Sequence, residues 1–555
     1  MKMLRIVAIA LMLILLASAC GGSSDEGSTD ESSSDAAESG GNGDEEGGSD
    51  DAGSDDGGSD DTDQVAATGS DQFVYANPFP IFDLDPASAF SSENVVLQNV
   101  YETLTTFNPP GSAELVSGSL AESWTSNDDA TEWTFKLREG VTFHDGTALT
   151  ADTVINSLQR NIDLDLGAAF ILLPILEMSA PDDLTVTFVL EYPAPLDIVM
   201  SSNYGAYIMS AEGLSQDADW FNAGNEAGTG PYTISSYTPN DSVELTQYAD
   251  YWGGWTDGQF AAAEIRLIED PVLAEQLVRN GDADFTYNLP FDSYASLDGV
   301  DGLSVVRGES MQNLFGLLNH ERLSPEVREA LVLSFPYDDV VGAFYGGEST
   351  RSQGIIPQAV WGSSNDLDLP ETDLDAAAKI LADAGVSDLS VTYSFDAGTT
   401  EQQQFGEVWK ANLATIGVDL VLDPLTFDAR WELAQADPAN AQDVFTLFWF
   451  PTFVTPYDFM FSLFRSEDAP FFNLGYYSNP EFDALIDEAD ALSGTDRDAA
   501  IDLFQQASQI LIDDNAAVFM VDIPDIQVIQ SDIDGYVSNP AYSGVVRFYD
   551  LTRNN

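Results

Sequence analysis

Residues 120–154 read LAESWTSNDDATEWTFKLREGVTFHDGTALTADTV, and this stretch decides the fold. Apolar and polar side chains alternate over residues 131–137, with Trp133 and Phe135 on the same side, which is typical of a half-buried strand. A glycine-bearing turn follows, and Thr150 then provides a side-chain cap for the start of a helix. A strand, a turn and a capped helix are therefore predicted in close succession.

Strand and helix patterns alternate along the rest of the chain. The clearest helical stripe has apolar side chains every three or four positions over residues 497–513. Repeated alternation of helices and strands predicts α/β domains. The predicted helices are 373–384, 401–416 and 497–513, and the predicted strands are 131–137, 184–190, 265–268, 418–422 and 517–521.

The stretch 120–154 resembles the signature of the family 5 solute-binding proteins of ABC importers, the type that binds oligopeptides and dipeptides. Other segments resemble that family in the same order, so the resemblance covers residues 71–555. These segments are VYETL (100–104), GTGPY (228–232), YWGG (251–254), AEQLVRNGDAD (274–284) and SPEVREALVLSFPYDDVVGAFYGG (324–347).

The resemblance implies a two-lobe α/β fold of the periplasmic-binding-protein type, in which a ligand cleft lies between the lobes. Crossings between the lobes are expected near residues 313–319 and 521–526, with hinge closure over the ligand. The permease and the ATPase of such an importer are separate chains. The expected parts are lobe I at 71–312 with an extra subdomain inserted at about 110–195, lobe II at 313–522, and a return to lobe I at 523–555.

Residues 1–20 have the pattern of an export signal: a basic start, and an apolar run shorter than the about 18 residues that span a membrane. LASAC at residues 16–20 resembles the lipobox of secreted lipoproteins, which implies that Cys20 is lipidated. An ordinary signal peptide cut after Ala19 is the alternative. Residues 21–70 contain no aromatic residue, lysine or arginine, and their Gly, Ser and acidic content predicts a disordered tether. We therefore expect an extracytoplasmic protein that only a lipid holds to the membrane.

The chain is strongly acidic, with 18 lysines and arginines against 94 aspartates and glutamates and a net charge of −76. This charge argues against nucleic acid and anionic lipid as partners, because both require a cationic surface. Since the acids are spread along the whole chain, we interpret them as a device for solvation in a saline medium, hence halotolerance. A trap for cationic ligands is the alternative.

Little in the sequence points to catalysis. His144 and His320 are the only histidines, which argues against a histidine-based triad and against a zinc site with several imidazoles. The chain has no phosphate-binding glycine loop, nucleophile elbow or dinucleotide motif. We expect a monomeric carrier without cofactor or metal rather than an enzyme. A secreted hydrolase using cleft carboxylates, and a surface sensor or adhesin without a transport role, are the alternatives.

The ligand segment is expected just before Pro456. In peptide-binding members of the family, an Asp four residues before such a proline pairs with the peptide's α-ammonium, but that position here is Thr452. A buried ammonium without a carboxylate is costly, so neutral or aromatic-tolerant solutes are expected rather than zwitterionic peptides. Rings of this segment either stack on the ligand or belong to the core. The expected ligand residues are Tyr75, Asn77, Phe79, Asn313, Trp449, Thr452, Phe453 and Thr455.

The halotolerance hypothesis predicts that the melting temperature rises with salt, because salt screens the repulsion between carboxylates. Thermal unfolding of the whole chain in 0.1 M and in about 2 M NaCl measures this, since the Debye length falls from about 10 Å at 0.1 M to about 3 Å at 1 M. A melting temperature that is highest at low salt would contradict the hypothesis.

Overall fold

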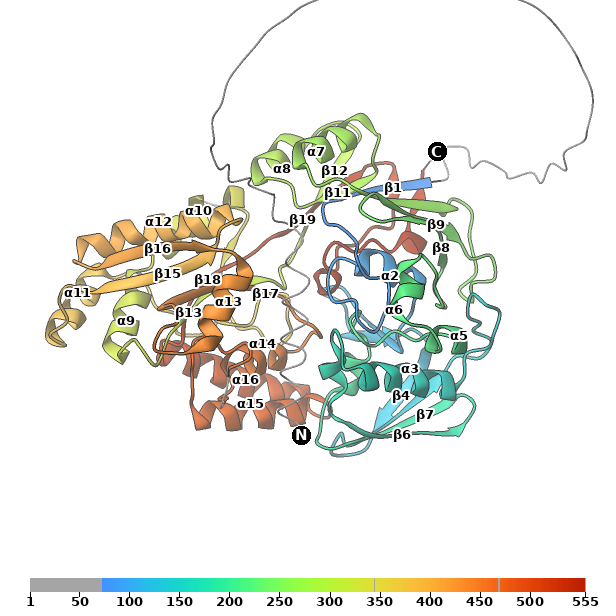
Figure 1. Ribbon diagram of the computed structural model, residues 1–555, viewed down its shortest axis with the longest axis horizontal. Helices are drawn as coiled ribbons and strands as arrows, with labels where there is room; N and C mark the ends of the chain where they lie inside the picture. Colours follow the sequence, from blue (N-terminus) through green and yellow to red (C-terminus); the bar gives the residue numbers. More distant parts are fainter. Residues whose placement is uncertain (1–71, 344, 468–469, 555) are drawn as a thin grey trace, which may run out of the picture.

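The computed structural model of the protein describes residues 72–343, 345–467 and 470–554. Two lobes lie side by side, and each is built on its own mixed β-sheet with helices packed against it (Figure 1). The fold is thus the two-lobe α/β arrangement that the sequence predicts. The export signal, Cys20 and the tether predicted at residues 21–70 lie outside the described residues.

The stretch that opened the sequence analysis folds as predicted. The buried positions of strand β5 (Glu132–Leu137) include Trp133 and Phe135, and its other side is exposed. Helix α3 (Ala151–Leu164) begins at Thr150, whose hydroxyl accepts the Thr153 backbone N–H at 3.3 Å. The cap satisfies an N–H group that the first turn of a helix otherwise leaves unpaired. The predicted helices at 373–384, 401–416 and 497–513 are also confirmed, as α11, α12 and α16.

Lobe I contains a seven-stranded sheet. Its first strand in the sequence, β1, is the central strand of this sheet. β1 pairs in parallel with β10 and β11, while β11 and β12 pair antiparallel with β19. In sheet order the strands are β12 (Leu303–Gly308), β19 (Asp525–Gln530), β11 (Phe285–Tyr287), β1 (Gln72–Asn77), β10 (Ala262–Leu267), β9 (Ser242–Gln247) and β8 (Tyr232–Thr238).

A second, four-stranded sheet with its own hydrophobic core completes lobe I, and α3 packs against β6 and β7 of this sheet. Its order is β4 (Ala121–Ser126), β5, β7 (Thr185–Leu190) and β6 (Ile175–Asp182). The short pairs are β2 (Thr105–Phe107) with β3 (Val116–Gly118), and β20 (Ile533–Asp534) with β21 (Thr552–Arg553). The helices are α2 (Asn94–Val100), α4 (Leu196–Val199), α5 (Ala211–Leu214), α6 (Ala218–Asn222), α7 (Pro271–Asn280) and α8 (Phe291–Leu297).

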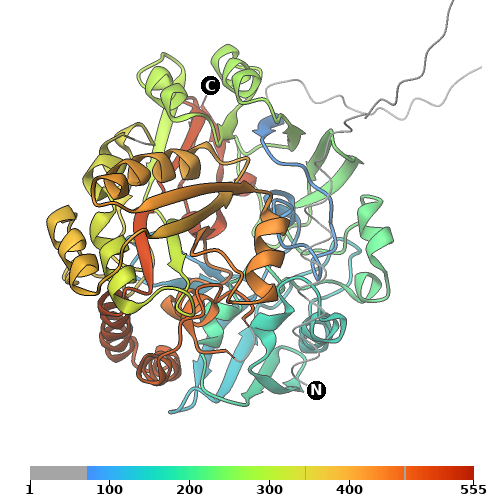
Figure 2. The same cartoon turned by 60° about the vertical axis from the view of Figure 1, so that its left-hand side comes forward.

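Lobe II contains a six-stranded sheet, and its helices α15 and α16 lie side by side at one end of the lobe (Figures 1 and 2). In order the strands are β14 (Thr350–Arg351), β18 (Ala517–Asp522), β13 (Asn313–Leu318), β17 (Val444–Trp449), β15 (Ser390–Asp396) and β16 (Asp419–Leu425). The helices are α9 (Pro325–Ser334), α10 (Tyr337–Ala343), α11 (Leu374–Asp383), α12 (Thr400–Thr415), α13 (Phe427–Ala436), α14 (Pro456–Phe464), α15 (Pro480–Ser493) and α16 (Arg497–Asp513).

The chain crosses between the two sheets in two short segments. Residues 309–312 join β12 to β13, and residues 523–524 join β18 to β19. The first crossing therefore lies just before Asn313, next to the region 313–319 near which the sequence analysis expected it, and β13 itself is paired on both sides. The crossings run next to each other, because the backbone N–H of Ile523 donates to the carbonyl of Gln312 at 2.9 Å.

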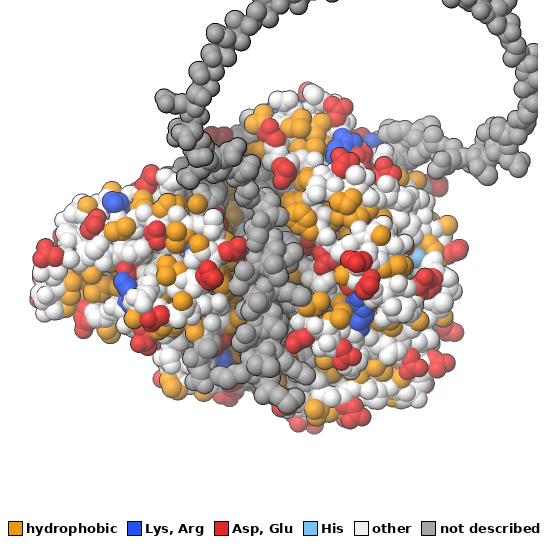
Figure 3. Space-filling view, in the orientation of Figure 1, with side chains coloured by type: hydrophobic (Ala, Val, Ile, Leu, Met, Phe, Trp, Pro, Cys, Tyr) orange, Lys and Arg blue, Asp and Glu red, His pale blue; other side chains and the backbone are white. Residues whose placement is uncertain are grey.

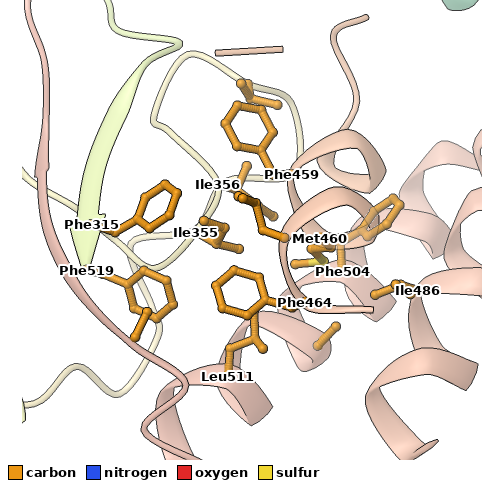
Figure 4. Packing of buried hydrophobic residues seen from close by; sticks show 14 of the residues in the cluster. Phe315, Ile355, Ile356, Phe459, Met460, Phe464, Ile486, Phe504, Leu511 and Phe519 are labelled. Carbon is orange, nitrogen blue, oxygen red and sulfur yellow. The ribbon is translucent and has the colours of Figure 1, made fainter. Parts of the chain in front are cut away.

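One face of the six-stranded sheet is covered by α14, α15 and α16. Aromatic and aliphatic side chains from Phe315 and Phe519 of the sheet interlock with Phe464 and Leu511 of the helices (Figure 4). The same buried cluster includes four residues of lobe I, Phe107, Val116, Ile198 and Tyr542, so apolar packing continues between the lobes. Burying each such ring removes apolar surface from water and contributes about 1.5–3 kcal/mol.

The turn between α15 and α16 forms a second contact between the lobes, distinct from the crossings. Arg497 at the start of α16 forms an ion pair with Asp197 of α4 at 2.5 Å, and the Asp197 side chain is 7% exposed. A Cβ atom at Gly494 would lie 2.6 Å from the Cβ of Ala130 and 3.2 Å from the carbonyl oxygen of Ala194. Gly494 has a φ of −82°, so close approach of lobe I, rather than backbone strain, is what requires a glycine there.

Acidic side chains are scattered over both lobes on the face shown in Figure 3, and they do not gather in a single patch. This distribution agrees with the interpretation of the charge as a general property of the surface. No helix among the described residues is long and apolar enough to span a membrane.

Gly494→Ala is predicted to push the α15–α16 turn away from lobe I, because neither Ala130 nor the Ala194 carbonyl is a flexible side-chain end. We expect a loss of about 1–3 kcal/mol in the free energy of unfolding and a larger radius of gyration, measured by urea unfolding and small-angle X-ray scattering. Gly342→Ala in α10 is the control, since a Cβ there has nothing within 4 Å. Equal behaviour of the two variants would contradict the close-contact interpretation.

Candidate functional site

Three neighbouring strands of lobe I end or begin at the edge where the chain crosses to lobe II. Ala76 pairs with Thr286, so Asn77 at the end of β1 lies level with Tyr287 of β11. Tyr287 pairs in turn with Gln527, near the start of β19. Residues level on adjacent strands point to the same face of a sheet, which places Asn77, Tyr287 and Gln527 on one face.

Lobe II presents a matching edge on the other side of the crossings. Asn313, the first residue of β13, pairs with Trp449 at the end of β17 and with Asp522 at the end of β18. The three side chains therefore lie on one face of the six-stranded sheet. Gln527 and Asp522 are five positions apart along the chain, so at most about 17 Å separates their backbones. One ligand of moderate size can reach both edges.

The segment after β17 lies between the lobes. The Ser202 hydroxyl of lobe I donates to the Thr452 carbonyl at 2.7 Å, and the half-buried Phe453 ring packs against the core of the four-stranded sheet. Phe450 is 48% exposed. Trp449 is half-buried, with its ring centroid 4.9 Å from that of Phe472 in an edge-to-face contact. The aromatic segment thus belongs to lobe II but contacts lobe I.

The remaining predicted residues divide into two groups. Tyr75 and Thr455 are fully buried and make structural bonds: the Tyr75 hydroxyl donates to the Gly544 carbonyl at 2.6 Å, and Thr455 caps α14. Asn77 and Asn313 are each 1% exposed, and Phe79 is 41% exposed beside Tyr287. Asn77 and Phe79 thus lie at the sheet edge of lobe I, and Asn313 and the 449–453 segment lie at the sheet edge of lobe II, whereas the bonds of Tyr75 and Thr455 hold backbone in place.

Asp458 is a carboxylate beside this segment that the sequence analysis did not single out. One of its oxygens accepts the backbone N–H of Thr452 at 3.2 Å and the indole N–H of Trp449 at 3.4 Å. Burial raises the pKa of Asp458 to about 7, although both hydrogen bonds lower it. The signal in the sequence was Thr455 followed three residues later by an acid, the pattern of a helix start. Asp458 therefore fixes Trp449 and Thr452 in position.

Asp522 plays a similar part at the second crossing. The Ser352 hydroxyl donates to one carboxylate oxygen at 2.7 Å, and the backbone N–H of Gln358 donates to the other at 3.0 Å. Burial raises the pKa of Asp522 to about 7, against the lowering effect of these two bonds. Asp522 thereby ties the 352–358 segment of lobe II to the end of β18.

Neither histidine lies among these residues. His144 bonds to Glu226 at 2.6 Å and to the Gly230 carbonyl at 2.8 Å, which links the loop before α3 to the segment leading into β8. Burial lowers the pKa of His320 to about 4, so its imidazole is neutral in the physiological range. Among the described residues, no group of three or more His, Cys, Asp and Glu side chains is arranged to hold a metal ion.

A separate small hollow lies in lobe I, beside Glu102. Tyr251 and Trp252 donate to the two Glu102 oxygens at 3.0 and 2.9 Å, and burial raises the pKa of this carboxyl. The hollow is lined by none of the predicted ligand residues. The sheet edges at the crossings therefore remain the candidate site.

Two α/β lobes joined by two short crossings, with an aromatic segment between them, are typical of a solute-binding protein. Residues 116–471 match the family described as bacterial extracellular solute-binding proteins, family 5 Middle. The chain therefore belongs to family 5 of the bacterial extracellular solute-binding proteins, which deliver their ligands to ABC importers.

Curated relatives and solved structures agree with this assignment. The chain is 27% identical over 500 residues to the probable D,D-dipeptide-binding periplasmic protein DdpA of Escherichia coli K12, covering 88% of this chain and 95% of the relative. It is 26% identical over 450 residues to the glutathione-binding protein GsiB of Pectobacterium atrosepticum, covering 79% and 86%. The structure of HbpA2 from Haemophilus parasuis has the same fold, with a TM-score of 0.76 at 22% identity over 87% of this chain and all of HbpA2.

Asp522→Asn is predicted to change how stability depends on pH. The folded state keeps the Asp522 proton between about pH 4 and 7, where the unfolded chain loses it, so this group's contribution to stability falls as pH rises through that window. Relative to the parent, the free energy of unfolding of Asp522→Asn should therefore rise from pH 4.5 to pH 8, by at most about 4 kcal/mol. Urea unfolding at both pH values measures it.

Asp301→Asn is the control variant for Asp522→Asn, because Asp301 is exposed and its substitution changes the net charge by the same amount. A difference between Asp522→Asn and the parent that stays constant from pH 4.5 to pH 8 would show that Asp522 is ionised throughout.

Proposed function

We propose that this protein binds a small solute between its lobes, at the facing sheet edges, and that the solute is peptide-like or another neutral solute that tolerates aromatic contacts. The observation that carries the proposal is the 449–453 segment, which supplies Trp449, Phe450 and Phe453 at the junction of the lobes. Aromatic rings with a few convergent polar groups are typical of small-molecule sites. Tyr75, Asn77, Phe79, Asn313, Thr452 and Thr455 complete the proposed site, with Tyr75 and Thr455 acting through the backbone they hold.

Peptide-like ligands remain part of this proposal, because the relatives are named for a D,D-dipeptide and for glutathione. Thr452 stands where peptide-binding members of the family have the aspartate that pairs with the α-ammonium. The chain therefore lacks that anchor for a zwitterionic peptide. The proposed protein is a carrier and not an enzyme, and it acts as a monomer with separate permease and ATPase chains. A hydrolase gains no support from the sheet edges, where the described residues include no histidine and the aspartates hold backbone and ring N–H groups.

Anchoring by a lipid on Cys20 outside the cytoplasm, with residues 21–70 as a tether, is a further part of the proposal. It rests on the lipobox-like sequence at 16–20. The spread of acidic residues supports tolerance of salt as the role of the surface charge.

Trp449→Ala is predicted to weaken binding of the solute that co-purifies with the protein, identified by native mass spectrometry, by about 10- to 100-fold, as expected when a ring buried against ligand is removed. Calorimetry with that solute measures the change. Trp220→Ala is a matched control, since Trp220 of α6 is also half-buried with one edge-to-face ring contact at 4.9 Å. An unchanged affinity in Trp449→Ala would remove Trp449 from the site.

Cys20→Ser is predicted to abolish the lipid anchor. The variant should partition into the aqueous phase of Triton X-114 or stay unprocessed, whereas the parent partitions into the detergent phase. Detergent partitioning of Cys20→Ser like that of the parent would rule out this anchor.

A further inference from the structure

Three amide side chains at the facing sheet edges have a buried carbonyl oxygen without a hydrogen-bond donor among the described residues. They are Asn77, Asn313 and Gln527, which are 1%, 1% and 2% exposed. The Nδ2 groups of Asn77 and Asn313 donate to the backbone carbonyls of Phe79 at 2.6 Å and Ile355 at 2.7 Å. These bonds fix which atom of each amide is the nitrogen, so the unpaired atom is the acceptor oxygen.

The orientation of Gln527 is set in a similar way. Burial raises the pKa of the neighbouring Asp525 carboxyl, and hydrogen bonds from Ser538 and Gln527 lower it. The Gln527 nitrogen therefore faces Asp525, and its oxygen has no donor among the residues that the structure describes. Asn77 and Gln527 are two strands apart, which is about 10 Å.

Acceptors therefore outnumber donors at these edges. Asp522 and Asp525 add carboxylates, and within the described chain none of the hydrogen bonds or ion pairs of Asn77, Asn313, Gln527, Asp522 or Asp525 involves lysine or arginine. A buried carbonyl left without a donor is unfavourable, so such groups normally have a partner in the functional state. An anionic ligand group would find unpaired acceptor oxygens here and, once Asp522 ionises near pH 7, a like charge rather than a counterion.

We propose that the ligand supplies N–H or O–H donors to Asn77, Asn313 and Gln527 and carries no anionic group. This inference rests on the proposed function and narrows its ligand class. The aromatic segment beside Asn313 binds the apolar part of the ligand, and the amide oxygens select its polar part. A free carboxylate or phosphate on the ligand is excluded by the lack of a cationic partner.

The first experiment presents the full-length protein with equimolar pools of tripeptides in two forms, C-terminal amides with a free amine and N-acetylated free acids, and with a pool of neutral trisaccharides. Native mass spectrometry measures what is retained. We expect the protein to retain at least 10-fold more of the amide or the trisaccharide pool than of the acid pool. Which of these two pools is retained shows whether the ligand's donors are N–H groups or sugar O–H groups. Equal or greater retention of the acids overturns the inference.

The solute that co-purifies is identified in the same spectra. A co-purified solute with a carboxylate or phosphate also overturns the inference, and one with donors but no anionic group supports it. If no pool is retained and no solute co-purifies, the proposed binding function itself fails.

The second experiment removes the acceptors. Asn313→Leu and Gln527→Met are each expected to reduce retention of the preferred pool at least 10-fold. Asn161→Leu is the matched control, because Asn161 is also fully buried, donates to the Gly205 carbonyl at 2.6 Å and has an unpaired oxygen, but lies in α3 away from the crossings. Parent-like retention by both Asn313→Leu and Gln527→Met would show that these oxygens serve buried water instead.

Discussion

The two adjacent crossing segments are the constraint on which the rest of the structure depends. Each continues into an interior strand: β13 lies between β18 and β17, and β19 lies between β12 and β11. Neither sheet is therefore complete without the chain that arrives from the other lobe. Because these strands are hydrogen-bonded on both sides, a relative motion of the lobes would have to bend residues 309–312 and 523–524. Such a hinge motion would move the sheet edges that carry Asn313 and Gln527 about a fixed line.

The acid excess and the buried acids have different physical meanings. Most of the described carboxylates lie at the surface, where salt can screen their mutual repulsion. Asp458 and Asp522 are 2% and 1% exposed, and burial raises the pKa of each to about 7. Both accept backbone N–H groups, so they fix local geometry at the expense of stability that is lost as pH rises from about 4 to about 7.

The sequence predicted the elements of the fold well, because amphipathic periodicity and helix caps are local signals. The start of α3 at Thr150 and the full length of α16 follow from such patterns. The assignment of residues 449–455 to the ligand, made from their distance to Pro456, stays a prediction. Gln527 and Asp522 were not, because only the register of strands far apart in the chain brings them to the same edge. With 94 acids in the chain, burial of a particular aspartate cannot be read from the sequence.

In the proposed site, ligand binding and lobe closure would use the same short segment. Trp449 and Thr452 are both held by Asp458, and the carbonyl of Thr452 accepts the Ser202 hydroxyl from the opposite lobe. A solute that packs on Trp449 therefore acts on the same rigid unit that makes the contact between the lobes. A ligand shifts a conformational equilibrium only by its difference in affinity for the two states. If the proposed site is correct, ligand contacts to this unit and to Asn77 of lobe I would exist simultaneously only when the lobes are close, and that difference would favour a closed form.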